Sequence, residues 1–291
     1  MAVNFNQKSQ KKRRTPHAQK PQSKGPNKSL GQHWLRDREI LDGIATSAEI
    51  ENGDFVLEIG PGLGTLTSSL LKFSSPNGKV LAVEFDENLA RKLPAQFPGK
   101  NLEIINIDFL EFDLDKLPKS YKVAANVPYY ITSKIVEKLL TSANKPAVAA
   151  LLVQKEVAER MVARAGDLSI LAIATQIYAQ AELGDLVPRE FFTPPPKVDS
   201  QVVILKTREQ NLLEEYNQKT DSSLTERQFF RIVKAGFAAK RKKISKSLSA
   251  NLALSREDVL QKLEKCQISP DLRAQDLTIG NWLELADIFA K

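Results

Sequence analysis

Short apolar, β-branched runs alternate with helical stretches from about residue 53 onward, and this alternation constrains the fold more than any other feature. Parallel strands need crossover connections, usually helices, and strands buried on both faces read as continuous apolar runs. We therefore predict an α/β protein whose parallel sheet is covered by helices on both faces. Strands are expected at 55–59, 80–84, 102–107, 123–125, 148–153 and 198–206, and helices at 65–72, 86–96, 132–140 and 154–164.

The strand signal ends at Lys206, and residues 209–291 show helical periodicity instead. A helix start is expected at 255–258 and a turn at Ser269-Pro270. The first 28 residues have only Val3 and Phe5 as sizeable apolar side chains, too few to offset the entropy of ordering. The sequence thus predicts a disordered basic tail at 1–28, an α/β domain at 29–207 and a small helical domain at 208–291.

The positive charge is concentrated in two segments. Eight of the 42 Lys and Arg residues lie in the tail, which has no acid, so the remaining 34 nearly balance the 35 Asp and Glu. A second cluster at 225–250 contains eight basic residues beside the single acid Glu226. Basic patches on a near-neutral body favour a polyanion partner, although a solvated tail and a charged helix face would have the same composition.

Composition also argues against several classes of protein. The single Cys266 rules out an internal disulfide framework and fits a reducing compartment. No apolar run approaches the roughly 20 residues of a membrane span, and no apolar segment near Met1 resembles a signal peptide. Three prolines in the tail oppose the helix of a mitochondrial transit peptide. We expect a cytoplasmic protein without a membrane partner.

A glycine-rich loop follows the first predicted strand. Gly60, Gly62 and Gly64 let the backbone pass close to a ligand and place amide donors at a helix N-terminus. Glu84 ends the next strand, where an acid can hold ribose hydroxyls. A dinucleotide enzyme is possible on these residues, but the spacing is G-x-G-x-G and not the G-x-G-x-x-G associated with a pyrophosphate. The tighter loop favours a nucleoside without phosphates, such as S-adenosylmethionine.

Polar side chains end several of the predicted strands. Glu58, Glu84, Asp108 and Asn126 lie at or just inside strand C-termini, the edge where open α/β sheets bind ligands. Asp108 by itself could be a loop or helix cap, but it is also placed to accept a hydrogen bond from an adenine amine. The four groups together favour a binding site.

The fourth of these strand ends runs into Asn126-Val127-Pro128-Tyr129. The Asn126 oxygen and the Val127 carbonyl could hold the two hydrogens of an aromatic amine, and Pro128 biases Val127 toward the extended conformation. Tyr129 could stack on the base. A strand-ending turn with a packing tyrosine is the alternative. Far along the chain, Phe192 could close the opposite face of the base pocket, whereas its neighbour Phe191 is expected in the core.

With these residues assembled, the chain resembles the KsgA-type small-subunit ribosomal RNA adenine dimethyltransferases, and it is also similar to the Erm methylases and the mitochondrial transcription-factor branch. The resemblance covers residues 28–291. The glycine loop is generic to methyltransferases, but its combination with Ser29-Leu30-Gly31-Gln32-His33 and Phe192-Thr193-Pro194-Pro195-Pro196-Lys197-Val198-Asp199-Ser200 is highly specific. The resemblance implies a Rossmann-like class I methyltransferase domain with a helical C-terminal domain.

The same resemblance implies the roles of individual residues. S-adenosylmethionine contacts are implied at His33, Leu35, Gly60, Gly62, Glu84, Asp108 and Asn126, and an acceptor-base site at Asn126, Val127, Pro128, Tyr129 and Phe192. Arg241, Lys242 and Lys243 would contact rRNA phosphates. The implied substrate is a pair of adjacent adenosines in 16S rRNA of the immature small subunit, with no metal and a monomeric enzyme. Trp34, where phenylalanine is usual, and a shortened loop at 165–169 depart from the family.

Two other functions stay open at this stage. An Erm-like methylase of large-subunit rRNA is the nearer one, although the helical domain and the late proline loop favour the small-subunit enzymes. The other is a non-catalytic assembly or transcription factor with a relic pocket, which the intact Glu84, Asp108, Asn126 and Tyr129 argue against.

Overall fold

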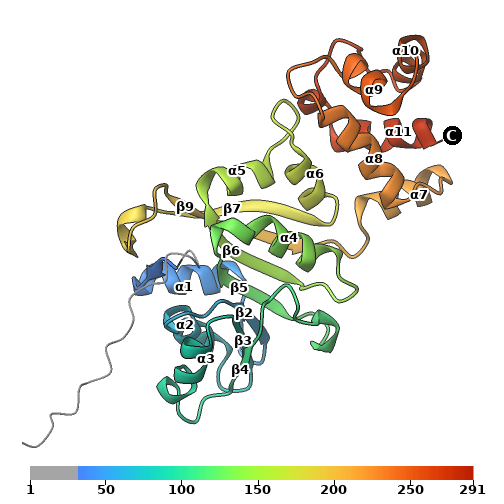
Figure 1. The fold of residues 1–291 in the computed structure, drawn as a ribbon. Coiled ribbons are helices and arrows are strands. Elements are labelled where there is room, and N and C mark those ends of the chain that lie inside the picture. Colours follow the sequence, from blue (N-terminus) through green and yellow to red (C-terminus); the bar gives the residue numbers. More distant parts are fainter. Residues whose placement is uncertain (1–31, 291) are drawn as a thin grey trace, which may run out of the picture.

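The computed structural model describes residues 32–290, so the expected basic tail lies outside the described residues. A seven-stranded sheet forms the body of the molecule, with strand order β4-β3-β2-β5-β6-β9-β7 (Figure 1). Its strands are β2 (Phe55–Ile59), β3 (Lys79–Glu84), β4 (Leu102–Asn106), β5 (Lys122–Asn126), β6 (Val148–Gln154), β7 (Ala179–Val187) and β9 (Ser200–Thr207).

Five neighbouring strands, from β4 to β6, pair in parallel as predicted. The last two do not. β9 pairs antiparallel with both β6 and β7, so the sheet is mixed and the prediction of a parallel sheet is wrong at this edge. β7 itself was not predicted, because it alternates buried and exposed residues and contains Gly184 and Asp185 near a register shift.

Helices cover both faces of the sheet, and alternate residues of the strands point to each face. Val56 of β2 packs with α1 (Arg38–Ser47) and α2 (Thr65–Ser74), whereas the next residue, Leu57, packs toward α4 (Thr132–Thr141), α5 (Lys155–Val162) and α6 (Ile170–Gln176). α1 was not predicted from the sequence; Asp37 caps it by accepting from two backbone amides. The predicted helix at 86–96 is shorter: α3 (Glu87–Lys92) gives way to the 3₁₀ turn η2 (Pro94–Gln96) at the proline.

A second, two-stranded sheet joins distant parts of the chain. β1 (Trp34–Leu35) pairs antiparallel with β8 (Phe192–Thr193), which follows the short turn η5 (Arg189–Phe191). This pairing places the segment before α1 beside the carboxyl ends of the strands. Two further 3₁₀ turns, η3 (Leu114–Lys116) and η4 (Tyr129–Ile131), follow β4 and β5.

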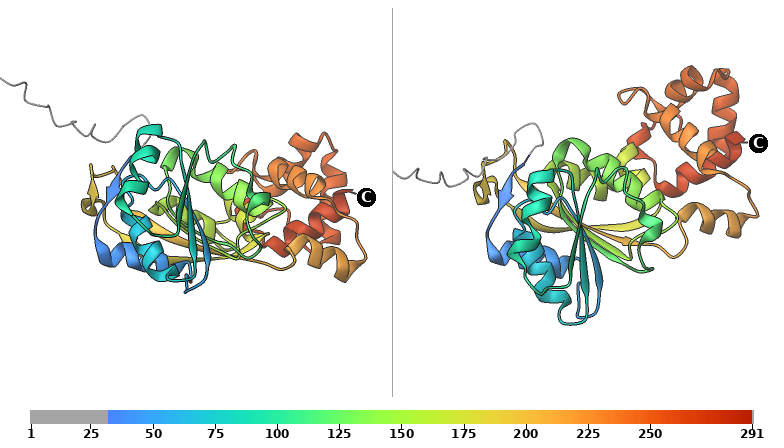
Figure 2. Two further views of the ribbon diagram at one scale, coloured as in Figure 1. Left: turned by 90° about the horizontal axis from the view of Figure 1, so that it is seen from below. Right: turned by 60° about the horizontal axis from the view of Figure 1, so that its bottom comes forward.

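After β9 the described chain is helical, as the periodicity predicts. It forms α7 (Leu212–Thr220), α8 (Glu226–Phe237), α9 (Ile244–Leu252), α10 (Arg256–Lys265), the turn η6 (Ala274–Asp276) and α11 (Ile279–Ala290). Ser255 caps α10, at the expected helix start. Figure 2 shows these helices gathered at one end of the sheet, and they share a hydrophobic cluster with α4, α5 and α6.

Candidate active site

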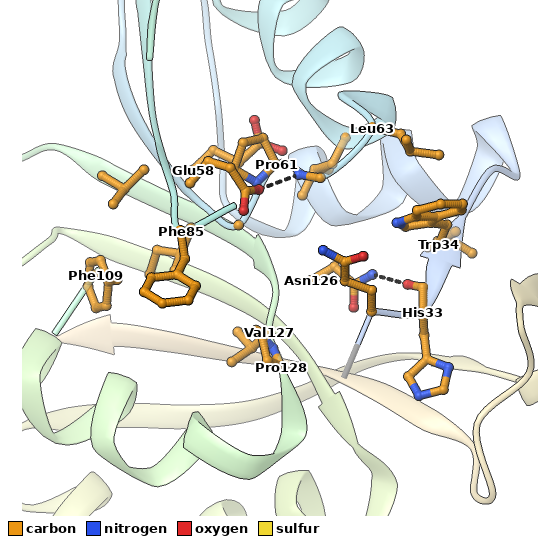
Figure 3. Close-up of a pocket in the computed structure, with 18 of the residues that line it drawn as sticks. His33, Trp34, Glu58, Pro61, Leu63, Phe85, Phe109, Asn126, Val127 and Pro128 are labelled. Atoms are coloured by element: carbon orange, nitrogen blue, oxygen red, sulfur yellow. Dashed lines mark hydrogen bonds between the residues drawn. The ribbon is translucent and has the colours of Figure 1, made fainter. Parts of the chain in front are cut away.

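The polar residues predicted at the strand ends line one cavity at the carboxyl edge of the sheet. Open α/β sheets bind ligands at this edge, because the loops that follow neighbouring strands diverge where the strand order reverses and leave a crevice between them. The cavity is bounded by the ends of β2, β3 and β5, by the segment after β4, and by β1 (Figure 3). It is lined by His33, Leu35, Gly60, Gly62, Glu84, Asp108, Asn126, Val127, Pro128 and Tyr129.

The glycine loop between β2 and α2 has left-handed backbone at three positions. Gly60, Gly62 and Gly64 have φ of 68°, 58° and 79°, which residues with a Cβ rarely adopt. A Cβ on Gly64 would stand 2.6 Å from Leu93 Cδ1, so this glycine also allows close packing. The loop therefore needs glycine for its conformation, and Gly60 and Gly62 line the cavity with backbone alone.

Glu84 ties β3 to this loop. One carboxylate oxygen accepts from the amide of Gly62 at 2.9 Å and the other from the amide of Asp86 at 2.8 Å. Burial raises the pKa of Glu84, opposed by these backbone hydrogen bonds. Each oxygen keeps a further lone pair for hydroxyl donors, because a carboxylate oxygen can accept more than one hydrogen bond. The site thus fits a ribose.

Glu58 lies deeper, at the end of β2, and is almost completely buried. Thr67 Oγ1 donates to its carboxyl group at 2.6 Å, and no ion pair reaches it from the described residues. Burial raises the pKa of Glu58 to about 8, because the charged form has no compensating cation.

Asp108 follows β4 and caps the turn after it, accepting from the Leu110 amide at 2.9 Å through one oxygen. The cap reading of this residue is confirmed, and Asp108 also lines the cavity, whereas its hydrogen bond to an adenine amine stays a prediction. Two aromatic rings that sequence reasoning missed stand nearby: Phe109 is buried, and Phe85 is 60% exposed at the mouth. Each phenylalanine directly follows an acid at a strand end, and this acid–phenylalanine pattern could have predicted their place in the site.

The turn after β5 is held from several sides. Asn126 Nδ2 donates to the His33 carbonyl at 3.1 Å, and the Val127 amide donates to the Leu152 carbonyl at 3.1 Å. The amide orientation leaves Asn126 Oδ1 available to a ligand, and the hydrogen bonds of the described residues include no donor to the Val127 carbonyl. Asn126 and Val127, which carry these two acceptors, both line the cavity.

Tyr129 is held by a hydrogen bond at its hydroxyl and by a stacking contact on its ring. Its hydroxyl shares a 2.7 Å hydrogen bond with Ser200 Oγ, and its ring lies 5.8 Å from that of His33 with an interplanar angle of 20°. Burial raises the pKa of the Tyr129 hydroxyl. A ring fixed in this way presents a preorganised face.

The two phenylalanines of the late loop lie opposite to their expected places. Phe192 is 2% exposed and packs in the cluster of α1 and α2, so its ring does not line the cavity. Phe191, expected in the core, is 42% exposed. The reason is the pairing of β8 with β1: Phe192 stands opposite Leu35, and the alternation of the strand turns Phe192 inward.

The predicted basic triplet forms the loop between α8 and α9, where Arg241, Lys242 and Lys243 are all exposed. Lys243 pairs with Asp271 at 2.7 Å. The shortened loop at 165–169 contacts the C-terminal helices: the Gly166 and Leu168 amides donate to the Gln275 carbonyl, and Gln275 Nε2 donates to the Gly166 carbonyl at 2.7 Å.

A family model described as ribosomal RNA adenine dimethylase matches residues 24–291. The chain belongs to this family.

Curated relatives and solved structures are similar to this protein over most of its chain. The ribosomal RNA small subunit methyltransferase A of Trichormus variabilis is 38% identical, over 90% of this chain and 97% of its own length. A dimethyladenosine transferase from Plasmodium falciparum has a TM-score of 0.71 and 27% identity, covering 87% of this chain and 96% of that one. The 23S rRNA methyltransferase ErmE has a TM-score of 0.68 and 29% identity, covering 89% and 100%. The expected methyltransferase fold is confirmed.

Among residues 32–290, no group of three or more His, Cys, Asp or Glu side chains is placed to hold a metal ion. Within the same range no helix is both long and apolar enough to span a bilayer.

Proposed function

We propose that this protein transfers methyl groups from S-adenosylmethionine to the N6 amines of two adjacent adenosines in 16S rRNA. The observation that carries this proposal is the juxtaposition of Asn126 and Val127 with Glu84 and Asp108 in one cavity. Asn126 and Val127 would hold the acceptor amine, and Glu84 and Asp108 would hold the nucleoside of the cofactor. This arrangement suits the transfer of a methyl group from one adenine nucleoside to another. Membership of the ribosomal RNA adenine dimethylase family supports the same activity.

The donor set of the cavity fits S-adenosylmethionine. Glu84 would hold the ribose hydroxyls and Asp108 the adenine amine, with Phe85 and Phe109 beside the base. The glycine loop leaves room for the ligand backbone, and His33, Leu35 and Asn126 would complete the contacts at the other end. When bound, S-adenosylmethionine supplies an electrophilic methyl group.

The turn after β5 would prepare the acceptor. An adenine N6 amine is a weak nucleophile because its lone pair is delocalised into the ring. Asn126 Oδ1 and the Val127 carbonyl can accept its two hydrogens and favour a pyramidal nitrogen, and Tyr129 can stack on the base. No strong general base is required, since the amine becomes acidic only after it is alkylated. Pro128 favours an extended Val127, and Phe192 supports the site through β1.

The C-terminal helices would bind the rRNA. Arg241, Lys242 and Lys243 are exposed at the start of α9, where phosphates could reach them. We place the substrate in the immature small subunit and the enzyme in the cytoplasm as a monomer. The 38% identity to a small-subunit methyltransferase over nearly the whole chain favours this substrate over large-subunit rRNA.

The test is methyl transfer to defined particles. Purified protein and labelled S-adenosylmethionine are incubated with small subunits from a strain lacking adenine dimethylation, and in parallel with unmethylated large subunits. We expect label only in the small-subunit rRNA, as dimethyladenosine detected by mass spectrometry. Label in the large subunit would instead assign an Erm-like activity. Cofactor binding without transfer to either particle would favour a non-catalytic factor.

A further inference from the structure

Trp34 carries a buried indole N–H without a hydrogen-bond partner among the described residues. Buried donors in folded proteins are almost always paired, and an unpaired one is costly. Trp34 also lines the candidate active site. A buried donor at the wall of a ligand cavity, with no partner among residues 32–290, points to a partner from outside this part of the chain.

The position of the indole is fixed by secondary structure. Trp34 belongs to β1 and stands opposite Thr193 in the pairing with β8. Its Cδ1 and Nε1 atoms are both 3.9 Å from the place where a Cβ on Gly62 would stand. The N–H edge of the ring therefore faces the glycine loop at Gly62.

The two ends of the cavity differ in chemistry. In Figure 3 Phe85 and Phe109 lie at one end, and Trp34 and His33 lie at the other. If the adenosine occupies the end with Asp108 and Glu84, as in the proposed function on which this inference rests, the amino-acid part of the cofactor extends toward Trp34. That part carries an ammonium group, which only donates, and a carboxylate, which only accepts.

We propose that Trp34 Nε1 donates a hydrogen bond to the carboxylate of the methionine moiety. An indole N–H is a donor only, so it can pair with the carboxylate but not with the ammonium group. The described residues that line the cavity include no Lys or Arg, so a carboxylate bound here depends on neutral donors and on His33. Under these conditions one additional N–H contributes measurably, since hydrogen bonds to charged groups are stronger than neutral pairs.

The experiment compares two ligands on two proteins by calorimetry. S-adenosylmethionine is compared with 5′-methylthioadenosine, which has the same nucleoside and sulfur but no amino-acid carboxylate. In Trp34→Phe, which keeps an aromatic ring and removes the donor, we expect the Kd for S-adenosylmethionine to rise about tenfold. The Kd for 5′-methylthioadenosine should change by less than about twofold. The unfolding temperature of the variant reports whether its fold is intact.

A second readout is independent of affinity. The chain has two tryptophans, and Trp282 is buried among the C-terminal helices against Phe237. We therefore expect S-adenosylmethionine to change the fluorescence of the wild type and to leave that of Trp34→Phe unchanged. If this variant does not fold, replacement of Trp34 by β-(3-benzothienyl)alanine keeps the ring shape and exchanges the N–H for sulfur.

The outcomes separate the two proposals. A wild type that fails to bind S-adenosylmethionine would overturn the proposed cofactor. A wild type that binds it, with a Trp34→Phe variant that binds both ligands normally or loses both equally, would overturn the role of the indole N–H alone.

Discussion

The two polar atoms of the Asn126 side-chain amide have different roles. Its amide nitrogen holds the His33 carbonyl, which orients the amide so that the oxygen is left for a ligand. This hydrogen bond joins the end of β5 to the segment before β1, 93 residues earlier in the chain. In the proposed function the residue would position the amine of the substrate, and its bond to His33 also keeps one wall of the cavity in place.

Asn126→Ala is expected to lower kcat about a hundredfold, because it removes the positioning of the attacking amine. The Kd for S-adenosylmethionine should rise only severalfold, because the hydrogen bond to His33 is also removed. Single-turnover methylation and calorimetry measure the two effects. Asn126→Asp is the matched control: it retains the acceptor oxygen and removes the amide donor. Turnover near that of the wild type in Asn126→Ala would refute the role.

Glu58 makes stability depend on pH. Its pKa of about 8 in the folded protein is well above the ordinary value of 4.5, mainly because the group is buried. Between these two values the folded chain binds a proton that the unfolded chain does not. The free energy of unfolding should therefore fall as the pH rises from about 4.5 to 8, by at most about 1.4 kcal/mol per pH unit from this group.

Glu58→Gln should flatten that dependence, since an amide cannot ionise and can still accept from Thr67. We expect the variant to gain unfolding temperature relative to the wild type as the pH rises from 5 to 9. Thermal unfolding across that range checks this. The exposed Glu51→Gln is the control and should follow the wild-type curve; an identical slope in Glu58→Gln would show that Glu58 is not the group responsible.

At the scale of elements, the start of α2 depends on one glycine for two reasons. Gly64 is its N-cap with left-handed backbone, and a Cβ there would also meet Phe97 Cε2 at 2.9 Å. Gly64→Ala should therefore destabilise the protein by about 2–4 kcal/mol, combining backbone strain with overpacking, and weaken cofactor binding. Gly53→Ala is the control, because Gly53 has φ of 97° but no atom within 4 Å of a Cβ. Denaturant unfolding should give about 1–2 kcal/mol for Gly53→Ala, and equal destabilisation of the two variants would argue against the packing contribution.

α8 carries a basic stripe that leads into the triplet at 241–243. Arg227, Arg231 and Lys234 stand at i, i+4 and i+7, so they share one face, and all three are exposed. None of them forms an ion pair within residues 32–290. The stripe therefore extends the positive surface of the α8–α9 loop along the helix.

The double variant Arg231→Ala, Lys234→Ala should weaken rRNA binding and reduce the slope of log K against log salt by about one for each phosphate that is no longer neutralised. Filter binding at several salt concentrations measures the slope. Lys265→Ala on the exposed surface of α10 is the control and should leave it unchanged. An unaltered slope in the double variant would place the RNA elsewhere.

At the scale of the whole molecule, the loop at 165–169 connects the sheet-bearing part of the chain to the C-terminal helices. Three hydrogen bonds link Gly166 and Leu168 with Gln275, which lies in η6. Just before η6, the Leu272 carbonyl accepts from the Ile244 amide at 2.7 Å, next to the basic triplet. These hydrogen bonds therefore join the loop at 165–169 to the C-terminal helices that carry the basic surface.

Gln275→Ala removes the side-chain bond of this connection. We expect faster hydrogen exchange at the Gly166 and Leu168 amides, with unchanged exchange in β6, because residues 164–167 are exposed and the loop is held by few hydrogen bonds. Gln261→Ala, on the exposed face of α10, should have no effect. Exchange mass spectrometry makes the comparison, and unaltered protection of the loop would show that backbone bonds suffice.

Local chemistry in the sequence determined six of the strands, the glycine loop and the polar strand ends, but not β1, β7 or β8. Buried parallel strands must be apolar, and left-handed backbone favours glycine. The acids at the strand ends lie together because successive βα units place the carboxyl ends of all parallel strands at one edge of the sheet. Glu84, Asp108 and Asn126 could therefore be assigned to one site before their hydrogen bonds were known. The disorder expected for residues 1–28 remains a prediction from composition.

Long-range pairing decided what the sequence could not. Whether β9 runs antiparallel, and which of Phe191 and Phe192 faces inward, depends on partners more than 40 residues away in the chain. The indole of Trp34 meets the glycine loop only because β1 pairs with β8. Side-chain periodicity states that neighbouring residues of a strand face opposite ways, but only the register with the partner strand determines which of them reaches the cavity.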